Sequence, residues 1–157
     1  MTDDYSIREY QAADREQIED VSWQIQEWEK QYFSGRAVSK EIIAKHVDRL
    51  ISLVNKGEGT ILVAISQDRC IGYVVGSVHN DFLNIEPVFY VNDMGVDKEH
   101  RGKGVGTELL RKIEQVGKEK YRLNKIMIAI ICGNDGAEKL YKKMGYIPYE
   151  LELIKSI

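Results

Sequence analysis

A chain of 157 residues with 43% hydrophobic and 30% charged side chains has the size and composition of one globular domain, which excludes disorder and fibrous structure. Its net charge of -3 argues weakly against nucleic acid as the main partner. No apolar run reaches the roughly 18 to 20 residues of a membrane span, and no basic and then apolar signal peptide opens the chain, so we expect a cytoplasmic single domain over residues 1–157 without a membrane partner.

The first half of the chain is predicted to contain a strand, two helices and a hairpin. Residues 5–10 are predicted to form the strand. A long helix follows, and its apolar stripe, expected to pack in the core, is Ile18, Val21, Ile25, Trp28 and Tyr32. Trp23 falls off this stripe, so it is either exposed or packed on a neighbouring element. Ser39 can cap a second helix, whose buried face would be Ile43, Val47, Leu50 and Val54. Residues 60–65 and 70–78 are β-branched runs that a short polar connection separates, which predicts an antiparallel hairpin.

The second half is predicted to alternate strands and helices. Residues 88–96 are apolar on both faces and should lie centrally in the sheet. Residues 102–120 turn helical, with a buried face of Leu109, Ile113 and Val116. Residues 125–131 form another strand, expected to lie parallel to a neighbour through a right-handed crossover. Asn134 can cap a last helix that Gly145 ends, and residues 149–154 alternate as a final strand. The order predicts a mixed α/β (α+β) fold, largely antiparallel in its first half.

The two cysteines, Cys70 and Cys132, lie in or beside apolar runs, and neither has a CxxC partner or a histidine at metal-ligand spacing. We therefore expect two buried free thiols and no metal site. Cys132 could in principle be a nucleophile, but no histidine accompanies it in the local sequence, which favours a packing role.

A glycine-rich stretch, Arg101-Gly102-Lys103-Gly104-Val105-Gly106-Thr107, follows the strand that ends at Val96. A P-loop needs Ser or Thr after its Gly-Lys, where this chain has Gly104, and the dinucleotide-binding fingerprint needs a third glycine where Thr107 stands. Glycines nevertheless let a backbone approach an anion, and the N–H groups of a helix's first turn hold it. The stretch therefore predicts a ligand that carries a pyrophosphate.

These residues resemble the signature of the GNAT superfamily of N-acetyltransferases, Arg/Gln-x-x-Gly-x-Gly/Ala after a strand that ends in Val. The matching residues are Arg101, Gly104 and Gly106, after Val96. The second family signature is matched by Asn134, Ala137, Tyr141, Gly145 and Tyr146. The resemblance covers most of the chain. It implies a GNAT-like mixed, mostly antiparallel central sheet with a splayed parallel strand pair and helices on both faces.

Carried over to this chain, the resemblance implies that acetyl-coenzyme A is the co-substrate. The residues whose backbone N–H groups would hold its pyrophosphate are Arg101, Gly102, Lys103, Gly104, Val105, Gly106 and Thr107. Main-chain groups of Met94 and Val96 would pair with the pantetheine arm, and one N–H there could polarise the acetyl carbonyl. Asn134 would contact the pantetheine, although a plain helix N-cap is equally good chemistry. Tyr141 would protonate the leaving thiolate, unless it only packs by its ring.

The sequence does not decide which residue accepts the proton of the amine. Many family members place Glu four residues before the strand's Val, but this chain has Asn92 there, which cannot take a proton. Asp93 points to the opposite face by strand alternation unless a bulge re-aims it. Glu86 and Asp81, before the strand, could act through water.

The resemblance predicts an N-acetyltransferase that moves the acetyl group to a primary amine by direct attack in a ternary complex. The alternative is a coenzyme A-binding regulatory module without catalysis, which the missing Glu favours and Tyr141 disfavours. Residues 1–30 carry a net charge of -6 and residues 97–125 a net charge of +4. Unless these charges serve solubility alone, they favour a cationic acceptor, either a small molecule or a lysine or N-terminal amine on a protein, rather than a neutral or acidic compound. Monomer and homodimer are both open.

Overall fold

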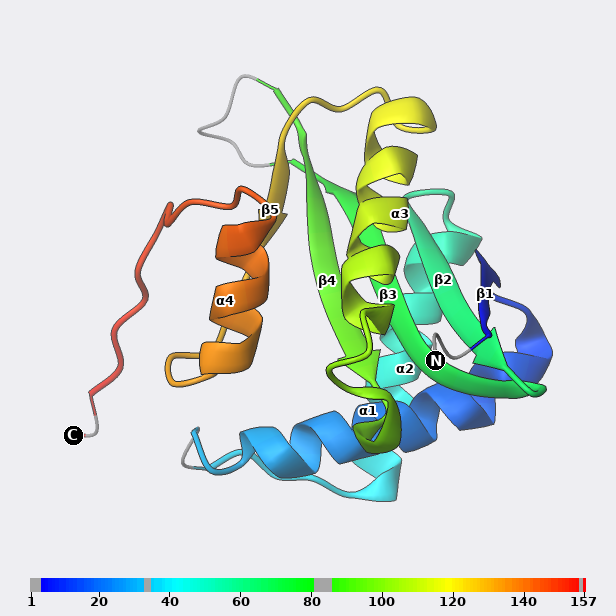
Figure 1. Cartoon of the computed structure of the whole chain (residues 1–157). Helices are drawn as coiled ribbons and strands as arrows, with labels where there is room; N and C mark the ends of the chain where they lie inside the picture. Colours follow the sequence, from blue (N-terminus) through cyan, green and yellow to red (C-terminus); the bar gives the residue numbers. More distant parts are fainter. Residues whose placement is uncertain (1–3, 33–34, 81–85, 156) are drawn as a thin grey trace.

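A computed structural model of the chain describes residues 4–32, 35–80, 86–155 and 157. Its elements follow one another as strands, short 3-10 turns and helices (Figure 1). They are β1 (Ser6–Glu9), η1 (Ala12–Asp14), α1 (Arg15–Glu29), α2 (Lys40–Asn55), β2 (Gly59–Ser66), β3 (Arg69–His79), β4 (Val88–Val96), η2 (Lys98–His100), α3 (Val105–Glu119), β5 (Ile126–Ile128) and α4 (Asp135–Lys143). In the described part of the chain, no helix has both the length and the apolar character that crossing a bilayer requires.

The five strands form one sheet in the order β1-β2-β3-β4-β5, so β4 lies inside it, beside the central β3. The first three pairings are antiparallel, and β5 alone runs parallel to its neighbour β4. This mixed, mostly antiparallel sheet confirms the expected fold class. The parallel pairing ends at Val91 and Ile128, whereas β4 continues to Val96. The predicted strand over residues 125–131 is therefore shorter, because its last residues have no ladder partner on β4.

Helices cover both faces of the sheet (Figure 1). α1 and α2 pack on one face and α3 on the other, which gives two buried clusters. The first is Ile18, Val21, Ile43, Val47, Leu50, Ile61, Val63, Cys70, Tyr73 and Val75. The second is Leu62, Ala64, Ile71, Val74, Phe89, Val91, Val105, Leu109, Leu110 and Ile113. Because apolar residues at helical spacing face one side, the predicted stripes supply both layers. Trp23 packs partly buried against the first cluster.

The turn and the helix ends predicted from short sequence patterns are present in the structure. Gln67 and Asp68 have positive φ values of 49° and 61°, as the two-residue turn of a twisted hairpin requires. The Ser39 hydroxyl accepts a hydrogen bond from the Ile42 N–H at 3.2 Å and caps α2. Gly145, at φ 92°, ends α4 with its N–H donated to the Lys142 carbonyl at 3.1 Å.

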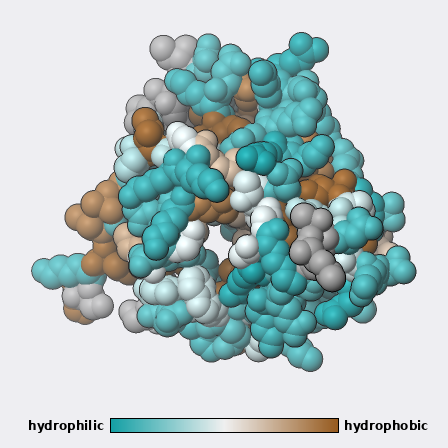
Figure 2. All heavy atoms as spheres, in the orientation of Figure 1, coloured by the Kyte–Doolittle hydropathy of each residue, from teal (hydrophilic) through white to brown (hydrophobic). Residues whose placement is uncertain are grey.

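Three predictions were wrong. Residues 149–154 form no strand: β5 is a three-residue edge, and the chain leaves α4 along a separate course, so Leu151 and Leu153 are 70% and 89% exposed. The apolar side chains of this segment gather at the left of the surface in Figure 2. Cys132 is exposed rather than buried, because it follows the point where β5 leaves β4. Trp28 is 37% exposed, because the end of α1 extends beyond the sheet towards α4 (Figure 1).

Candidate active site

The glycine-rich stretch forms the turn between the end of β4 and the first turn of α3. Gly102 and Gly104 have φ values of 76° and 88°, which side chains other than glycine rarely adopt. Helix α3 therefore begins at Val105 rather than at residue 102. Gly104 is its N-cap and supplies no side-chain cap, so the first-turn N–H groups remain available to an external anion. A β-carbon built on either glycine meets no atom within 4 Å, so the surroundings leave room for a ligand.

Helix α1 fixes the start of this turn. The Gln24 side chain donates to Asp97 Oδ2 at 2.9 Å and accepts from the Lys98 N–H at 3.0 Å. The Asp97 carboxylate also accepts from the Glu99 N–H and lies 3.2 Å from His100 Nδ1. Burial raises the pKa of Asp97, but these hydrogen bonds outweigh it and leave the pKa below its usual value. Sequence reasoning missed Gln24, because no local pattern shows which strand end a helix residue will reach.

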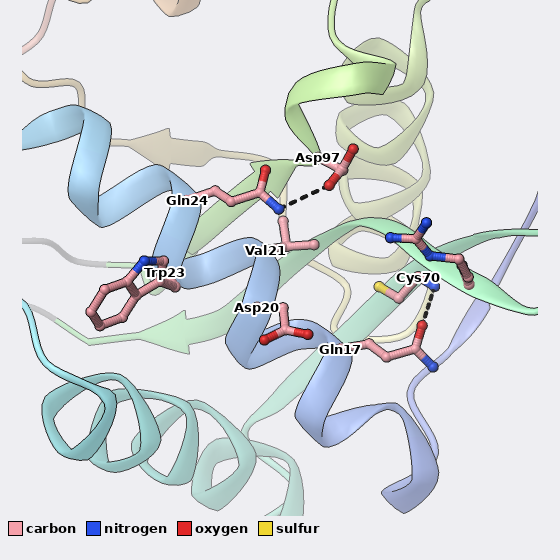
Figure 3. Close-up of a pocket in the computed structure, with 8 residues that line it drawn as sticks. Gln17, Asp20, Val21, Trp23, Gln24, Cys70 and Asp97 are labelled. Atoms are coloured by element: carbon pink, nitrogen blue, oxygen red, sulfur yellow. Dashed lines mark hydrogen bonds between the residues drawn. The ribbon is translucent and has the colours of Figure 1, made fainter.

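A hollow of about 310 Å³ adjoins this junction (Figure 3). Its lining is Gln17, Asp20, Val21, Trp23, Gln24, Arg69, Cys70 and Asp97. In Figure 3, Gln24 and Asp97 point towards each other, and Gln17 reaches the backbone N–H of Cys70 at 2.7 Å. Neither the glycine turn nor Tyr141 lines this hollow, and its polar groups join α1 to β3 and β4. We interpret it as a structural junction beside the site.

The site itself lies in the central cleft, which we define as the space between α4 and β4 above the end of α1. The space-filling surface is hollowed between these elements in Figure 2. The end of α1 closes one side of it, since a β-carbon on Gly133 would lie 2.8 Å from the Tyr32 ring. Residues far apart in the sequence, Tyr32 and Gly133, therefore meet beside this opening.

Tyr141 lies on α4 at this cleft and packs against the second cluster. Burial, with smaller contributions from the charges of Asp93 and Glu29, raises the pKa of Tyr141 to about 12. The phenol therefore keeps its proton at neutral pH. Its ring is 5.8 Å from that of Tyr146, whose hydroxyl donates to Glu114 at 2.7 Å.

A β-bulge places the Asp93 carboxylate on the α1 and α2 side of the sheet. The register of β3 on β4 shifts so that Val75 faces Asp93 while Gly76 faces Val91, which leaves Asn92 as the extra residue. Asn92 accepts from the Ser77 hydroxyl at 2.8 Å. From the sequence, re-aiming of Asp93 required a bulge in this strand, and the structure contains that bulge.

The comparison with protein families decides the family. Residues 22–146 match the model of the acetyltransferase (GNAT) family. The chain belongs to the GNAT acetyltransferase family.

Individual relatives agree with this GNAT assignment. An uncharacterized N-acetyltransferase of Methanocaldococcus jannaschii is 33% identical over 84 residues, which are 54% of this chain and 50% of the relative. An N-alpha-acetyltransferase of Sulfurisphaera tokodaii is 26% identical over 95 residues, 57% of each chain. This chain thus matches about half the length of these curated relatives. A solved Pyrococcus furiosus structure, described as an acetyl transferase, is 28% identical with a TM-score of 0.76, and the match covers 98% of this chain and 100% of that one.

Within this GNAT domain, the predicted pantetheine edge lies where β4 has no β5 partner. Met94 and Val96 pair with Val74 and Gly72 on β3, and beyond Val91 the other edge of β4 faces the cleft. The carbonyl of Val96 accepts from Arg101 Nε at 3.0 Å. The Arg101 side chain thus already engages one acceptor at this end of β4.

The remaining predicted cofactor residues surround the start of α3 and α4. The Asn134 side chain accepts from the Ala137 N–H at 3.1 Å, so its helix N-cap role is confirmed and its contact with pantetheine stays a prediction. Val105 is buried, which leaves only its backbone for a ligand, while Lys103 is exposed. Thr107 follows in the first turn of α3. Gly106 lies against Val96 and Leu140, with 3.6 and 3.8 Å to a built β-carbon.

The other candidate bases differ in position. Glu86 is exposed before β4, and Asp81 lies outside the described residues. His46 and Tyr73, which the sequence did not single out, contact Asp93 from α2 and β3. Only the fold brings these two residues to the carboxylate, so no sequence spacing could have found them.

Several acids of residues 1–30 are paired. Asp14 accepts from Arg8 at 2.7 Å, Glu19 from Arg15 at 3.0 Å, and Glu29 forms an ion pair with Arg36. Burial is the main reason that the pKa of Glu29 is raised, and the Arg36 charge opposes it. Arg8 and Arg15 are already counted in the net charge of -6, so of these three pairs only the one with Arg36, which lies outside residues 1–30, offsets that charge further.

Proposed function

We propose that residues 1–157 form one N-acetyltransferase domain that transfers the acetyl group of acetyl-coenzyme A to a primary amine. Amine and thioester react directly in a ternary complex, without a covalent enzyme intermediate. The observation that carries the proposal is the pairing, across one cleft, of a glycine turn at a helix start with a protonated tyrosine. The first suits a pyrophosphate, and the second suits a leaving thiolate.

In this proposal the backbone of residues 101–107 binds the pyrophosphate. The positive φ of Gly102 and Gly104 turns the chain so that N–H groups of the first α3 turn point at the anion. The cleft edge of β4 at Met94 and Val96 holds the pantetheine arm, with Arg101 moving from the Val96 carbonyl. An N–H on this edge donates to the acetyl oxygen as charge develops on it.

Tyr141 is the proposed acid. The amine lone pair attacks the acetyl carbon, the C–S bond breaks, and the thiolate takes the phenolic proton. Tyr141 then regains a proton from the nitrogen that has formed the amide, directly or through water. Its raised pKa, about 12, suits a group that must be protonated when the thiolate leaves.

The proposed acceptor is cationic. Two carboxylates act on the Tyr141 phenol, those of Asp93 and Glu29, and they favour an ammonium group over a carboxylate at the cleft. A small polyamine and a peptide amine both fit this chemistry. The name of the Sulfurisphaera tokodaii relative, an N-alpha-acetyltransferase, supports including peptides with free amino termini among the candidates.

Thiol release from acetyl-coenzyme A, at low and high salt, tests the proposal. The panel contains polyamines, aminoglycosides, lysine-bearing peptides, peptides with free amino termini and acidic amino acids. We expect cationic amines to give the highest kcat/KM and salt to lower it. A preference for acidic amino acids contradicts the cationic acceptor. Tight acetyl-coenzyme A binding without transfer to any amine identifies the alternative, a coenzyme A-binding regulatory module.

A further inference from the structure

Asp93 is held by two hydrogen bonds to the same carboxylate oxygen. The Tyr73 hydroxyl donates to Oδ2 at 2.8 Å, and His46 Nε2 lies 2.7 Å from that oxygen. The Tyr73 side chain is fully buried, and the Asp93 side chain is only 11% exposed. Within the described residues, the second oxygen, Oδ1, has no hydrogen-bond partner. A nearly buried carboxylate with one oxygen fixed and one available can receive a ligand N–H.

The two partners of the Asp93 carboxylate come from two elements of the fold, the strand β3 and the helix α2. Tyr73 lies on the central strand β3, and His46 lies on α2, 47 positions from Asp93 in the sequence. Burial, followed by the charge of Asp93, raises the pKa of Tyr73 well above its ordinary value, so the phenol remains a donor to the carboxylate. The Asp93 side chain therefore has a set orientation before any substrate binds.

Other charged groups surround this pair at the cleft. Burial raises the pKa of Glu29 on α1, and its partner Arg36 and the charges of Asp93 and His46 also contribute to that pKa. After burial, the charges of Asp93 and Glu29 contribute to the raised pKa of Tyr141 on α4, so both carboxylates act electrostatically on the proposed acid. A base that takes a proton from an ammonium substrate and an acid that protonates the leaving thiolate together suit acyl transfer.

We infer that Asp93 is the proton acceptor for the amine, and that His46 is a positioning residue that orients it. This inference rests on the proposed acetyl transfer and deepens it. The available oxygen binds an N–H of the ammonium and takes its proton, which breaks the N–H bond and leaves the electron pair on nitrogen. The neutral amine then attacks the thioester, and Asp93 later returns the proton to water. The reaction releases one proton overall, in addition to the thiol.

The bulge explains why Asp93 can act although Asn92 occupies the family's usual Glu position. The Asn92 side chain is engaged with Ser77, and as an amide it cannot accept a proton. The next residue supplies a carboxylate on the same side of the sheet as Tyr73. The chain therefore retains a carboxylate at the cleft by using the neighbouring position of a bulged strand.

Asp93→Asn tests the base, with kcat/KM measured for the best basic amine of the panel from pH 7 to 10. We expect a loss of about 10²- to 10⁴-fold near pH 7. The loss should shrink as pH rises, because solution then supplies neutral amine. Asp20→Asn, the same change in the hollow of Figure 3, should leave kcat/KM within about threefold, as expected for surface changes.

His46 is tested by a pair of variants. His46→Gln keeps an N–H donor and should retain most of kcat, whereas His46→Leu should lose about 10-fold or more in kcat through misplacement of Asp93. Acetyl-coenzyme A affinity, measured by calorimetry, should be unchanged in all four variants, which also shows that each is folded.

Three results contradict the inference. A loss in Asp93→Asn that is the same at every pH shows a structural role, and full activity at pH 7 shows that another group takes the proton. Equal kcat in the two His46 variants removes its positioning role. If the unmodified protein binds acetyl-coenzyme A but acetylates no amine, the proposed function itself has failed, and the inference falls with it.

Discussion

Gly117 on α3 lies directly against the Phe89 ring on β4: a β-carbon on the glycine would be 2.6 Å from Phe89 Cδ1. Both residues are buried, and the contact brings the helix close to the strand. The close approach of α3 to the sheet therefore depends on residue 117 being a glycine, which has no side chain.

Gly117→Ala should destabilise the fold by about 1 to 3 kcal/mol, because overpacking outweighs the better helix propensity of alanine. The melting temperature should fall by roughly 2 to 12 °C. The control is Gly136→Ala in the first turn of α4, where a β-carbon meets only Asn134 Oδ1 at 3.8 Å. That variant should be neutral or slightly stabilised, and equal melting of the two would contradict the close approach.

Gly104→Val should abolish the stabilisation that acetyl-coenzyme A gives. Ligand at 100 times its Kd adds about 2.7 kcal/mol to a protein that binds it only when folded. Valine at φ 88° would strain the turn and block the pyrophosphate. Gly57→Val is the control, since Gly57 has a φ of 72° and open surroundings far from the cleft. It should lower the melting temperature but keep the ligand-induced shift. A normal shift in Gly104→Val would mean that the turn binds no cofactor.

Tyr141→Phe should bind acetyl-coenzyme A normally but turn over about 10²-fold more slowly, because one proton donor is lost. Tyr146→Phe, the neighbouring ring whose hydroxyl bonds Glu114, should keep normal turnover. Since the pKa of Tyr141 is raised to about 12, the phenol stays protonated up to pH 10. Deprotonation of this acid should therefore cause no loss of kcat below pH 10. Unchanged turnover in the Phe variant would assign protonation to water or another group.

The two cysteines should react at very different rates. Burial raises the pKa of Cys70 to about 11, and its side chain is nearly inaccessible, whereas Cys132 is exposed. Because the thiolate is the reactive form, a disulfide reagent should label one thiol rapidly in the native protein and two after unfolding. Cys132→Ser should remove the fast phase. Two fast thiols would place Cys70 at the surface. Thiol-release assays need this variant or a blocked Cys132.

Gln24→Ala should weaken acetyl-coenzyme A binding, because Gln24 ties both Asp97 and the Lys98 backbone to α1. Losing two hydrogen bonds to the turn should cost about 1 to 3 kcal/mol in total. Part of this cost should appear as a lower free energy of unfolding and part as weaker binding of acetyl-coenzyme A. Gln17→Ala is matched to it, since Gln17 on the same helix bonds the Cys70 N–H instead. We expect stability loss in both and a higher Kd only for Gln24→Ala. Equal Kd values would show that the junction does not position the turn.

Sequence reasoning succeeded where a signal is local. Ser39 and Asn134 cap their helices, Gly145 ends α4, and the glycine turn follows β4, because each depends on residues within one turn. It failed where long-range pairing decides. The alternation of residues 149–154 predicted a strand, but a strand forms only beside a partner, and the three-residue β5 offers little edge. The contacts of Asp93 with His46 and Tyr73 likewise join distant segments.

The extra residue Asn92 divides β4 into two segments, and the odd-numbered side chains of one segment face the opposite side of the sheet from those of the other. Before Asn92 the odd-numbered side chains, Phe89 and Val91, face α3; after it the odd-numbered Asp93 faces α2. Deleting Asn92 would therefore remove the bulge and leave both segments on their present faces, whereas regular pairing of every residue from Val88 to Val96 would turn the Asp93 carboxylate towards α3. For anyone aligning or redesigning this strand, the bulge matters more than the identity of residue 92, because a regular strand of the same length would carry the Asp93 carboxylate on the other side of the sheet.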